Sequence, residues 1–120
     1  MVVTANRKWR VVSEQEFRDK LIEALEPHRG YYCAVTGPGR SGAVAAVYAS
    51  HFLYIPYVPP QGDFAAFRGR VLVIDTARWT GKTIRKLTSK VSKQGAIADS
   101  LFIYDEKADG LVKFWYEVFP

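Results

Sequence analysis

The sequence predicts an α/β fold with a mostly parallel central sheet flanked by helices. Apolar runs typical of buried strands alternate along the chain with segments that have helical patterns. Two of these runs are each followed by a glycine-containing loop and then by a helical segment, as in parallel sheets. The 120 residues, 48% of them hydrophobic, suffice for one domain over 1–120 with a single buried core.

The first predicted element is an N-terminal helix over about 13–26. Ser13 and Glu16 have the spacing of a capping box, in which both side chains bind backbone N–H groups at the start of a helix. Apolar residues then recur at helical spacing until Pro27 interrupts the pattern. We therefore expect one amphipathic helix before the first strand of the sheet.

A strand, a loop and a helix are predicted next. The continuous apolar run YYCAV at 31–35 is typical of a strand that is buried on both faces. The loop TGPGRSG follows at 36–42, and the small residues at 43–50 predict a helix. The apolar run FLYIPYV at 52–58 is expected to form the next strand.

The second half of the chain repeats this order. A buried strand is predicted for VLVID at 71–75, and the apolar residues at 84–91 mark the inner face of a helix. A further strand is predicted for SLFIY at 100–104 and a final aromatic strand for 111–119. We therefore expect a core over about 30–106, with the aromatic C-terminal strand beside it.

The charge of the chain favours anionic partners. Its formal net charge is +5 and its pI is about 9.4, which fits either nucleic acid or a small phosphate. No acidic residue occurs between Asp75 and Asp99. The basic residues of that segment are Arg78, Lys82, Arg85, Lys86, Lys90 and Lys93. The later ones are typical of a solvated helix face, whereas the first two lie near a candidate phosphate site.

Cysteine usage and hydropathy indicate a cytoplasmic protein. Cys33 is the only cysteine, so neither a disulfide framework nor a zinc cluster of cysteines is expected. The chain has no stretch of eighteen apolar residues and no apolar signal segment after its basic N-terminus. Membrane insertion and secretion are therefore not expected.

The segment at 71–83 combines a strand, one acid, a small-residue loop and the start of a helix. Free backbone N–H groups at a helix N-terminus bind phosphate, and Gly81 allows close approach of the backbone. The hydroxyls of Thr80 and Thr83 and the charge of Lys82 complete an anion cradle. Asp75, at the strand end, is placed to accept hydrogen bonds from the hydroxyls of a sugar.

This segment resembles the phosphoribosyl-diphosphate signature of the type I phosphoribosyltransferases. That signature has four apolar strand residues, an acidic pair, three variable residues and then Thr-Gly-x-Thr. Asp75, Thr80, Gly81 and Thr83 match it. The loop at 36–42 resembles the pyrophosphate loop of the same family, and the similarity covers roughly 30–106.

The resemblance implies transfer of ribose 5-phosphate from phosphoribosyl diphosphate to a purine or pyrimidine base, with release of pyrophosphate. Asp75 would hold the ribose and Mg²⁺, and Arg40 would stabilise the leaving diphosphate. The implied pyrophosphate loop is Thr36, Gly37, Pro38, Gly39, Arg40, Ser41 and Gly42. The implied 5-phosphate loop is Thr76, Ala77, Arg78, Trp79, Thr80, Gly81, Lys82 and Thr83.

The C-terminal region resembles the base-binding region of short purine-type members. Phe114 or Trp115 would stack on the base, and Lys107 would donate a hydrogen bond to an exocyclic oxygen. An equally plausible interpretation of this aromatic strand is that it packs on the core or on a second subunit. Members of the family are often dimers, and a homodimer is expected here by resemblance.

Two departures from the family pattern support an alternative function. Thr76 replaces the second acid of the pair, and Trp79 replaces an acid that handles the proton of the base in purine-using members. The alternative is a weakly active or inactive module that binds a phosphoribosyl group or a nucleotide. Such a module would also be able to contact nucleic acid through its basic helix, although no RNA-recognition pattern is present.

Two other phosphate-binding motifs match the sequence only in part. Gly37, Gly39 and Gly42 satisfy the dinucleotide pattern G-x-G-x-x-G, but the next apolar run ends in prolines rather than in an acid that would hold a ribose. The residues GKT at 81–83 resemble part of a Walker loop, but Thr76 occupies the position of its first glycine. A nucleoside triphosphatase is therefore not expected.

Overall fold

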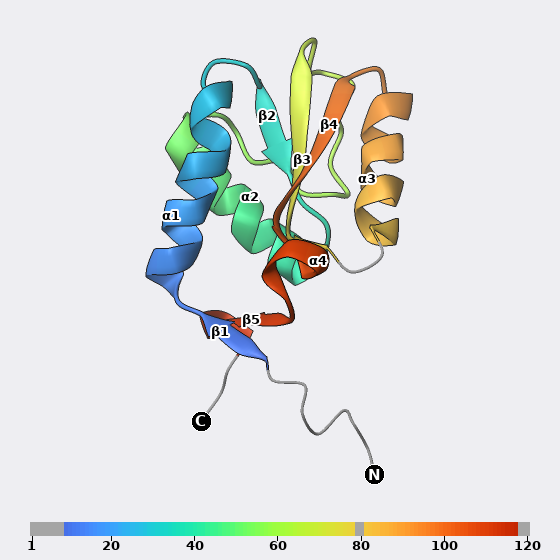
Figure 1. Cartoon of the computed structure of the whole chain (residues 1–120). Helices are drawn as coiled ribbons and strands as arrows, with labels where there is room; N and C mark the ends of the chain where they lie inside the picture. The colour runs from blue at the N-terminus through green and yellow to red at the C-terminus, as the bar shows by residue number, and fades with distance from the viewer. Residues whose placement is uncertain (1–8, 79–80, 118–120) are drawn as a thin grey trace.

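A computed structural model of the chain describes residues 9–78 and 81–117, and it has the predicted α/β class (Figure 1). The strands are β1 (Arg10–Val12), β2 (Ala34–Thr36), β3 (Arg70–Arg78), β4 (Ile97–Asp105) and β5 (Val112–Phe114). The helices are α1 (Glu14–Leu25), α2 (Gly39–Leu53), α3 (Lys82–Lys93) and α4 (Glu106–Asp109), with 3₁₀ turns η2 (Glu26–His28) and η3 (Trp115–Glu117). None of the helices in the described ranges is long and apolar enough to cross a membrane.

Helix α1 begins at the predicted cap. The Ser13 hydroxyl accepts a hydrogen bond from the backbone N–H of Glu16 at 3.1 Å. In a full capping box the Glu16 side chain would also accept a hydrogen bond from the backbone N–H of Ser13. Here the Glu16 carboxylate instead pairs with Arg10 at 2.8 Å and accepts a hydrogen bond from the Tyr104 hydroxyl. The cap thus satisfies one N–H group of the first turn, while Glu16 connects α1 to β1 and β4.

Removing this cap is expected to have a moderate effect on stability. Ser13→Ala should lower the free energy of unfolding by about 1 kcal/mol, because it leaves one N–H group of the first turn without its acceptor. Urea denaturation followed by circular dichroism measures this change. Ser92→Ala, on the exposed face of α3, is the matched control and should leave the unfolding midpoint within error. Equal losses in the two variants would contradict the role of the cap.

The central sheet is parallel, with strand order β2-β3-β4. Both backbone groups of Val35 bond to the segment after α2: its N–H donates to Pro56 at 3.0 Å, and its carbonyl accepts from Val58 at 2.9 Å. This segment therefore lies along the edge of β2 away from β3. Strand β3 pairs with the opposite edge of β2. The direction in which successive segments are added to the sheet therefore reverses at β2.

The predicted strand at 52–58 is wrong. Helix α2 continues to Leu53, Tyr54 adopts a left-handed conformation at its end, and Tyr57 forms only an isolated bridge with Val35. Prolines 56, 59 and 60 lack the N–H group that a longer ladder requires. The apolar residues of this run therefore serve first as the end of a helix and then as an extended edge.

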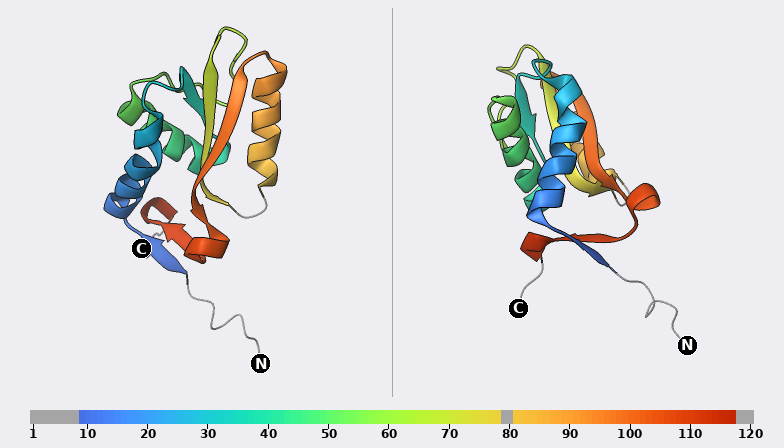
Figure 2. Two further views of the ribbon diagram at one scale, coloured as in Figure 1. Left: turned by 45° about the horizontal axis from the view of Figure 1, so that its top comes forward. Right: turned by 60° about the vertical axis from the view of Figure 1, so that its left-hand side comes forward.

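Helices cover both faces of the sheet (Figure 2). One set of alternating strand residues packs with α1 and α2, and the other packs with α3. The first set contains Val35, Leu72 and Ile74, and the second contains Ala34, Val71 and Val73. The predicted inner face of α3 is confirmed, since Ile84, Leu87 and Val91 are buried. With both faces covered, the carboxyl ends of the strands are where a ligand would bind.

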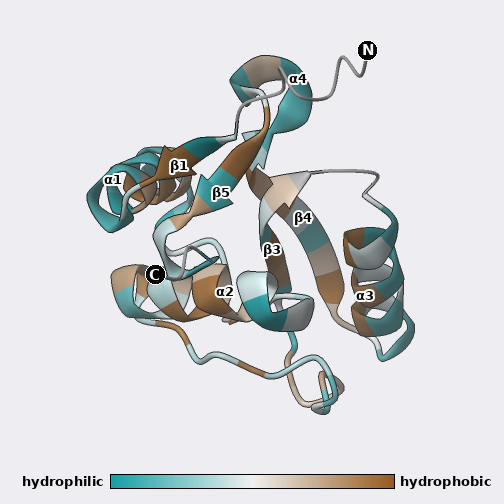
Figure 3. Cartoon of the chain, turned by 90° about the horizontal axis from the view of Figure 1, so that it is seen from below, coloured by the Kyte–Doolittle hydropathy of each residue, from teal (hydrophilic) through white to brown (hydrophobic). Residues whose placement is uncertain are grey.

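A second, two-stranded parallel sheet lies beyond these carboxyl ends. It pairs β1 with β5, two segments from opposite ends of the chain (Figures 1 and 3). The predicted C-terminal strand at 111–119 is therefore too long: it ends at Phe114, and η3 follows. Phe17 of α1 makes edge contacts with the ring of Phe114, which holds this small sheet against the core.

Candidate functional site

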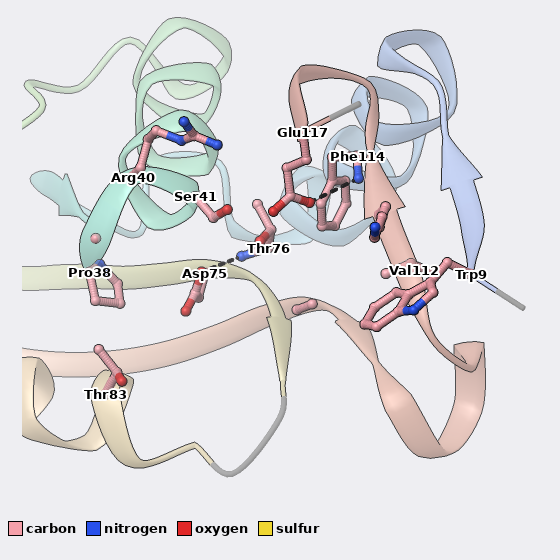
Figure 4. Close-up of a pocket in the computed structure, with 13 residues that line it drawn as sticks. Trp9, Pro38, Arg40, Ser41, Asp75, Thr76, Thr83, Val112, Phe114 and Glu117 are labelled. Carbon is pink, nitrogen blue, oxygen red and sulfur yellow. Dashed lines mark hydrogen bonds between the residues drawn. The ribbon is translucent and has the colours of Figure 1, made fainter. Parts of the chain in front are cut away.

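A cavity of about 460 Å³ opens at the carboxyl ends of the central strands (Figure 4). Both predicted loops contribute to it, together with the small sheet. Its lining residues are Trp9, Pro38, Gly39, Arg40, Ser41, Asp75, Thr76, Ala77, Thr83, Val112, Lys113, Phe114 and Glu117. The structure thus brings together the segments around Arg40, Asp75 and Thr83, although they lie far apart in the sequence.

The first loop is shorter than predicted. Thr36 is the end of β2, and α2 already begins at Gly39, so the residues expected to form a loop up to Gly42 are the first helical turn. No acidic residue occurs in this turn. Its free backbone N–H groups and the helix dipole therefore favour an anion next to Arg40 and Ser41.

Two glycines allow this turn to lie close to β3. A Cβ atom on Gly37 would be 2.1 Å from the carbonyl oxygen of Gly42 and 2.5 Å from that of Ile74. A Cβ atom on Gly42 would in turn be 2.7 Å from the carbonyl carbon of Gly37. Side chains are therefore excluded at both positions, which places the N-terminus of α2 beside the end of the strand that carries Asp75.

The second helix N-terminus belongs to α3. Gly81, with φ +75°, precedes Lys82, and the first turn of α3 also has no acidic residue. Asp75 and Thr83 line both the main cavity and a smaller one of about 50 Å³, which Gly81 and Lys82 also line. The backbone N–H groups at this helix N-terminus favour an anionic group.

The remaining residues of the predicted 5-phosphate loop are placed differently. Strand β3 extends through Thr76 and Ala77 to the backbone of Arg78, so these residues are strand rather than loop. Thr76 is buried, with 3% of its surface exposed, and lines the main cavity. Trp79 and Thr80 lie outside the described residues.

Asp75 lies between the two helix N-termini. Burial raises the pKa of its carboxyl group to about 6, while the backbone N–H of Thr76, which donates to Oδ1 at 2.7 Å, opposes that increase. The side chain points into the cavity, on the side of Thr83 (Figure 4). At neutral pH the carboxylate is ionised and partly desolvated, so it favours hydroxyl donors or a cation.

The C-terminal turn η3 is attached to the first turn of α2. The Tyr116 hydroxyl donates to Oγ of Ser41 at 2.8 Å, and the guanidinium of Arg40 lies 5.9 Å from the centre of the Tyr116 ring. Burial raises the pKa of the Tyr116 hydroxyl, so it stays protonated and able to donate. Nothing in the local sequence pattern indicated this connection.

The residues predicted to bind a base are not brought together. Lys107 is exposed on α4, and Trp115 packs on Phe17 and Tyr48; neither lines the cavity. Phe114 does line it, but only 2% of its surface is exposed, so its ring is mainly part of the core.

Trp9, Lys113 and Glu117 also line the cavity, and sequence reasoning missed all three. Trp9 directly precedes β1 and Lys113 belongs to β5, so the pairing of these strands brings the two residues together, with the Lys113 ammonium group 5.4 Å from the centre of the Trp9 ring. Glu117 belongs to η3, which follows β5.

The donor set fits one type of magnesium site. Among the described residues, no group of three or more His, Cys, Asp or Glu side chains is arranged to hold a metal. Mg²⁺ commonly keeps several waters and binds through one or two carboxylates together with substrate phosphates. A single carboxylate, that of Asp75, suits a magnesium ion that is bound together with a diphosphate. It does not suit a site in which protein groups supply all the ligands.

Comparisons with known proteins identify the fold. No family model and no curated protein matches the sequence. The structure is similar to a purine phosphoribosyltransferase from Pyrococcus horikoshii, with a TM-score of 0.74, 22% identity, and 93% of this chain and 95% of that chain covered. It is also similar to a Helicobacter pylori xanthine-guanine-hypoxanthine phosphoribosyltransferase, with a TM-score of 0.71 and 15% identity over 93% of this chain and 94% of that chain. A third similar structure is a hypothetical protein from Neisseria gonorrhoeae with bound ppGpp, with a TM-score of 0.67 and 13% identity over 93% of this chain and 92% of that chain. The fold is therefore that of the type I phosphoribosyltransferases, which confirms the prediction from the two loops.

Proposed function

We propose that this protein binds phosphoribosyl diphosphate and transfers its ribose 5-phosphate to a nitrogenous base, releasing pyrophosphate. One observation carries the proposal: a single cavity joins the Asp75 carboxylate to the N-termini of two long helices, neither of which has an acid in its first turn. Two anion sites on either side of a hydroxyl-binding carboxylate suit a sugar with a phosphate at one end and a diphosphate at the other.

Each end of the cavity has a proposed role. The first turn of α3, with Gly81, Lys82 and Thr83, would hold the 5-phosphate, and the first turn of α2, with Arg40 and Ser41, would hold the diphosphate. Asp75 would accept hydrogen bonds from the ribose hydroxyls and bind Mg²⁺. When bound, that ion supplies positive charge that neutralises the diphosphate. The phosphate-binding roles of Arg78, Trp79 and Thr80 stay predictions.

The proposed chemistry is mainly electrostatic. The C1–O bond of the sugar breaks and its electron pair leaves with the diphosphate, while a nitrogen of the base donates a pair to C1 and then releases its proton. Negative charge therefore grows on the diphosphate beside Arg40 and the N-terminus of α2, and positive charge grows on the ribose beside Asp75. Charged groups and dipoles that are already oriented toward these charges lower the barrier.

Phosphate binding at α3 is tested by a pair of glycine variants. Gly81→Val should weaken phosphoribosyl-diphosphate binding at least about tenfold, because a side chain enters the space of the 5-phosphate. Calorimetric titration with and without Mg²⁺ measures this affinity. Gly95→Val, at the other end of α3, is the control, since Gly95 also has a positive φ (+104°) and has open space around it. Equal affinities in the two variants would contradict the proposed cradle.

Turnover is tested by measuring pyrophosphate release across purine and pyrimidine bases. Release with one base would establish the transferase and its acceptor. Binding without release would favour the second candidate, a nucleotide-binding module without turnover. Two observations favour that candidate: Thr76 in place of an acid, and the similarity to a structure with bound ppGpp. Salt-dependent binding to a polyanion would instead indicate nucleic acid.

Homodimer formation also stays a prediction. The aromatic strand that was expected to offer an apolar surface packs within the chain instead, since Phe114 is buried and Trp115 contacts Phe17. Sedimentation velocity at several protein concentrations measures the oligomeric state.

A further inference from the structure

The hydroxyl of Tyr116 joins two parts of the site from behind the cavity wall. It donates to Oγ of Ser41 at 2.8 Å. Burial raises the pKa of this hydroxyl, and side-chain hydrogen bonding with Ser41 and with Thr76 opposes the increase. Ser41 and Thr76 both line the main cavity (Figure 4), whereas Tyr116 is not among its lining residues in the described part of the chain. Tyr116 therefore acts on a ligand only through these two neighbours.

The Tyr116 ring is fixed by the aromatic residues around it. It stacks on Phe114 with 5.7 Å between ring centres and 8° between the ring planes, and it makes an edge contact with Trp115 at 5.0 Å. Phe114 is buried and Trp115 packs on Phe17, so the Tyr116 ring is anchored to the core. Removing the hydroxyl alone should leave this packing intact.

The hydroxyl hydrogen of Ser41 is left for a ligand. Each hydroxyl carries one hydrogen and can also accept. Because a phenol is a stronger acid than an alcohol, Tyr116 is the donor in its bond with Ser41. Within residues 9–78 and 81–117, Oγ of Ser41 has no other hydrogen-bond partner. Ser41 lies in the acid-free first turn of α2, where an anion is favoured, and donation from Tyr116 makes it a stronger donor to that anion.

Thr76 connects Tyr116 to Asp75. Burial raises the pKa of Asp75, and hydrogen bonding with the backbone and the side chain of Thr76 opposes that increase. The hydroxyl hydrogen of Thr76 is thus within reach of both the carboxylate and the phenol oxygen, but it serves one acceptor at a time. An ionised carboxylate is the stronger acceptor, so without a ligand Thr76 donates to Asp75. Sugar hydroxyls that donate to Asp75 would compete with Thr76 and turn its hydrogen toward Tyr116.

We propose that Tyr116 is a positioning residue that couples the sugar and diphosphate sites through the hydroxyls of Thr76 and Ser41. A sugar bound at Asp75 turns Thr76 toward Tyr116. The bond from Tyr116 to Ser41 then becomes stronger, and so does the bond from Ser41 to the diphosphate. The coupling is reciprocal, so a bound diphosphate also favours the sugar.

The coupling gives Thr76 a function of its own. This residue stands where the signature of the family has its second acid. An ionised carboxylate there would only accept hydrogen bonds, whereas a hydroxyl can donate to either neighbour. The inference rests on the proposed function, because that function assigns the sugar to Asp75 and the diphosphate to α2.

The coupling factor, which is the ratio of pyrophosphate affinities with and without a bound sugar phosphate, tests the inference. Calorimetry at a fixed Mg²⁺ concentration measures it. The sugar phosphate is 1-deoxyribofuranose 5-phosphate, which has no oxygen at C1 and so leaves space for pyrophosphate. The factor should be at least about threefold larger in the wild-type protein than in Tyr116→Phe, as for residues of one hydrogen-bond network. Repulsion between the two anions is present in both proteins and cancels in this comparison.

Further variants make the test specific. Tyr48→Phe is the matched control, since the Tyr48 hydroxyl donates to Glu14 at 2.7 Å and not to a residue of the cavity. It should keep the wild-type coupling factor. Thr76→Val, which has a similar shape without the hydroxyl, should lower the factor as much as Tyr116→Phe does. The two changes combined should lower it no further, because both hydroxyls belong to one chain.

The outcomes separate the two proposals. If either pyrophosphate or the sugar phosphate fails to bind the wild-type protein, the proposed function fails, and the inference fails with it. If both bind, and folded Tyr116→Phe or folded Thr76→Val keeps the wild-type coupling factor, only the inference is overturned. An equal loss of coupling in Tyr48→Phe would also overturn it, because the Tyr116 hydroxyl would then have no specific role.

Discussion

Asp75→Asn is expected to reduce turnover at least about a hundredfold while making the folded protein more stable at about pH 7.5. Under the proposed function, turnover would fall because an amide has no negative charge with which to stabilise a developing positive charge on the ribose or to bind Mg²⁺. Stability rises because burial disfavours the charged wild-type carboxylate. Within the described residues, the pKa of Asp75 is lowered by hydrogen bonds from Thr76 and not by a cationic side chain. The amide is of similar size and carries no charge that burial would disfavour.

The direction of the pH dependence follows from the pKa of Asp75. Its folded-state value of about 6 lies above the ordinary value of 3.8, so the folded state binds more protons than the unfolded state between these values. Stability therefore falls as the pH rises from about 4 to about 6, and the full penalty applies above that range. The shift corresponds to about 3 kcal/mol, and because the carboxylate is partly exposed to solvent we expect Asp75→Asn to remove a penalty of about 2 kcal/mol at pH 7.5 and to have little effect near pH 4.

Urea denaturation at the two pH values, combined with pyrophosphate release, checks both parts of this prediction. Asp19→Asn, on the exposed face of α1, is the control and should change neither stability nor turnover. Unchanged turnover in Asp75→Asn would remove Asp75 from the reaction. A variant that is less stable than the wild-type protein at pH 7.5 would show that the carboxylate has a stabilising partner and is not destabilised by burial.

Local sequence patterns predicted the central fold well. The cap at Ser13, the buried strand that becomes β3 and the apolar face of α3 each depend on residues within a few positions of one another. Two glycine-containing segments with a strand before them and a helix after them were enough to place Asp75 between the N-termini of two helices. These features follow from backbone conformation and helix periodicity, which a single sequence contains.

Other features depend on contacts between distant residues, and the sequence carries no local signal for them. An apolar run such as 52–58 is compatible with either the end of a helix or a strand. In the structure α2 continues to Leu53 and ends at Tyr54, which has a left-handed conformation. Trp9 and Lys113 line the same cavity because β1 pairs with β5. Resemblance alone therefore assigned base binding to Lys107 and Trp115, which the structure keeps away from the cavity lining.

Gly37→Ala is expected to destabilise the protein by at least about 3 kcal/mol, near the upper end of what single substitutions do. The added methyl group would lie 2.1 Å from the carbonyl oxygen of Gly42 and 2.5 Å from that of Ile74. Both neighbours are backbone atoms, which cannot rotate away as a flexible side chain can. The N-terminus of α2 must therefore move away from β3, and the buried contacts between these elements are lost with it.

Gly39→Ala is the control that separates crowding from backbone strain. Gly39 lies two residues further on and has φ +63°, but a Cβ atom there would meet no atom within 4 Å. Its replacement should cost about 1 kcal/mol, the usual penalty for alanine in a left-handed conformation. Urea denaturation compares the two variants, and equal losses would mean that the loop is free to move.

We expect Gly37→Ala to weaken diphosphate binding more than Gly39→Ala does, in the same order as the losses of stability. In Gly37→Ala, the displaced first turn of α2 would carry Arg40 and Ser41 away from Asp75, so affinity for pyrophosphate should fall even at temperatures where the variant is folded. Calorimetry with inorganic pyrophosphate measures this loss. The close approach of two glycines would then have a functional reason: it fixes the distance between the diphosphate site and the carboxylate that holds the sugar.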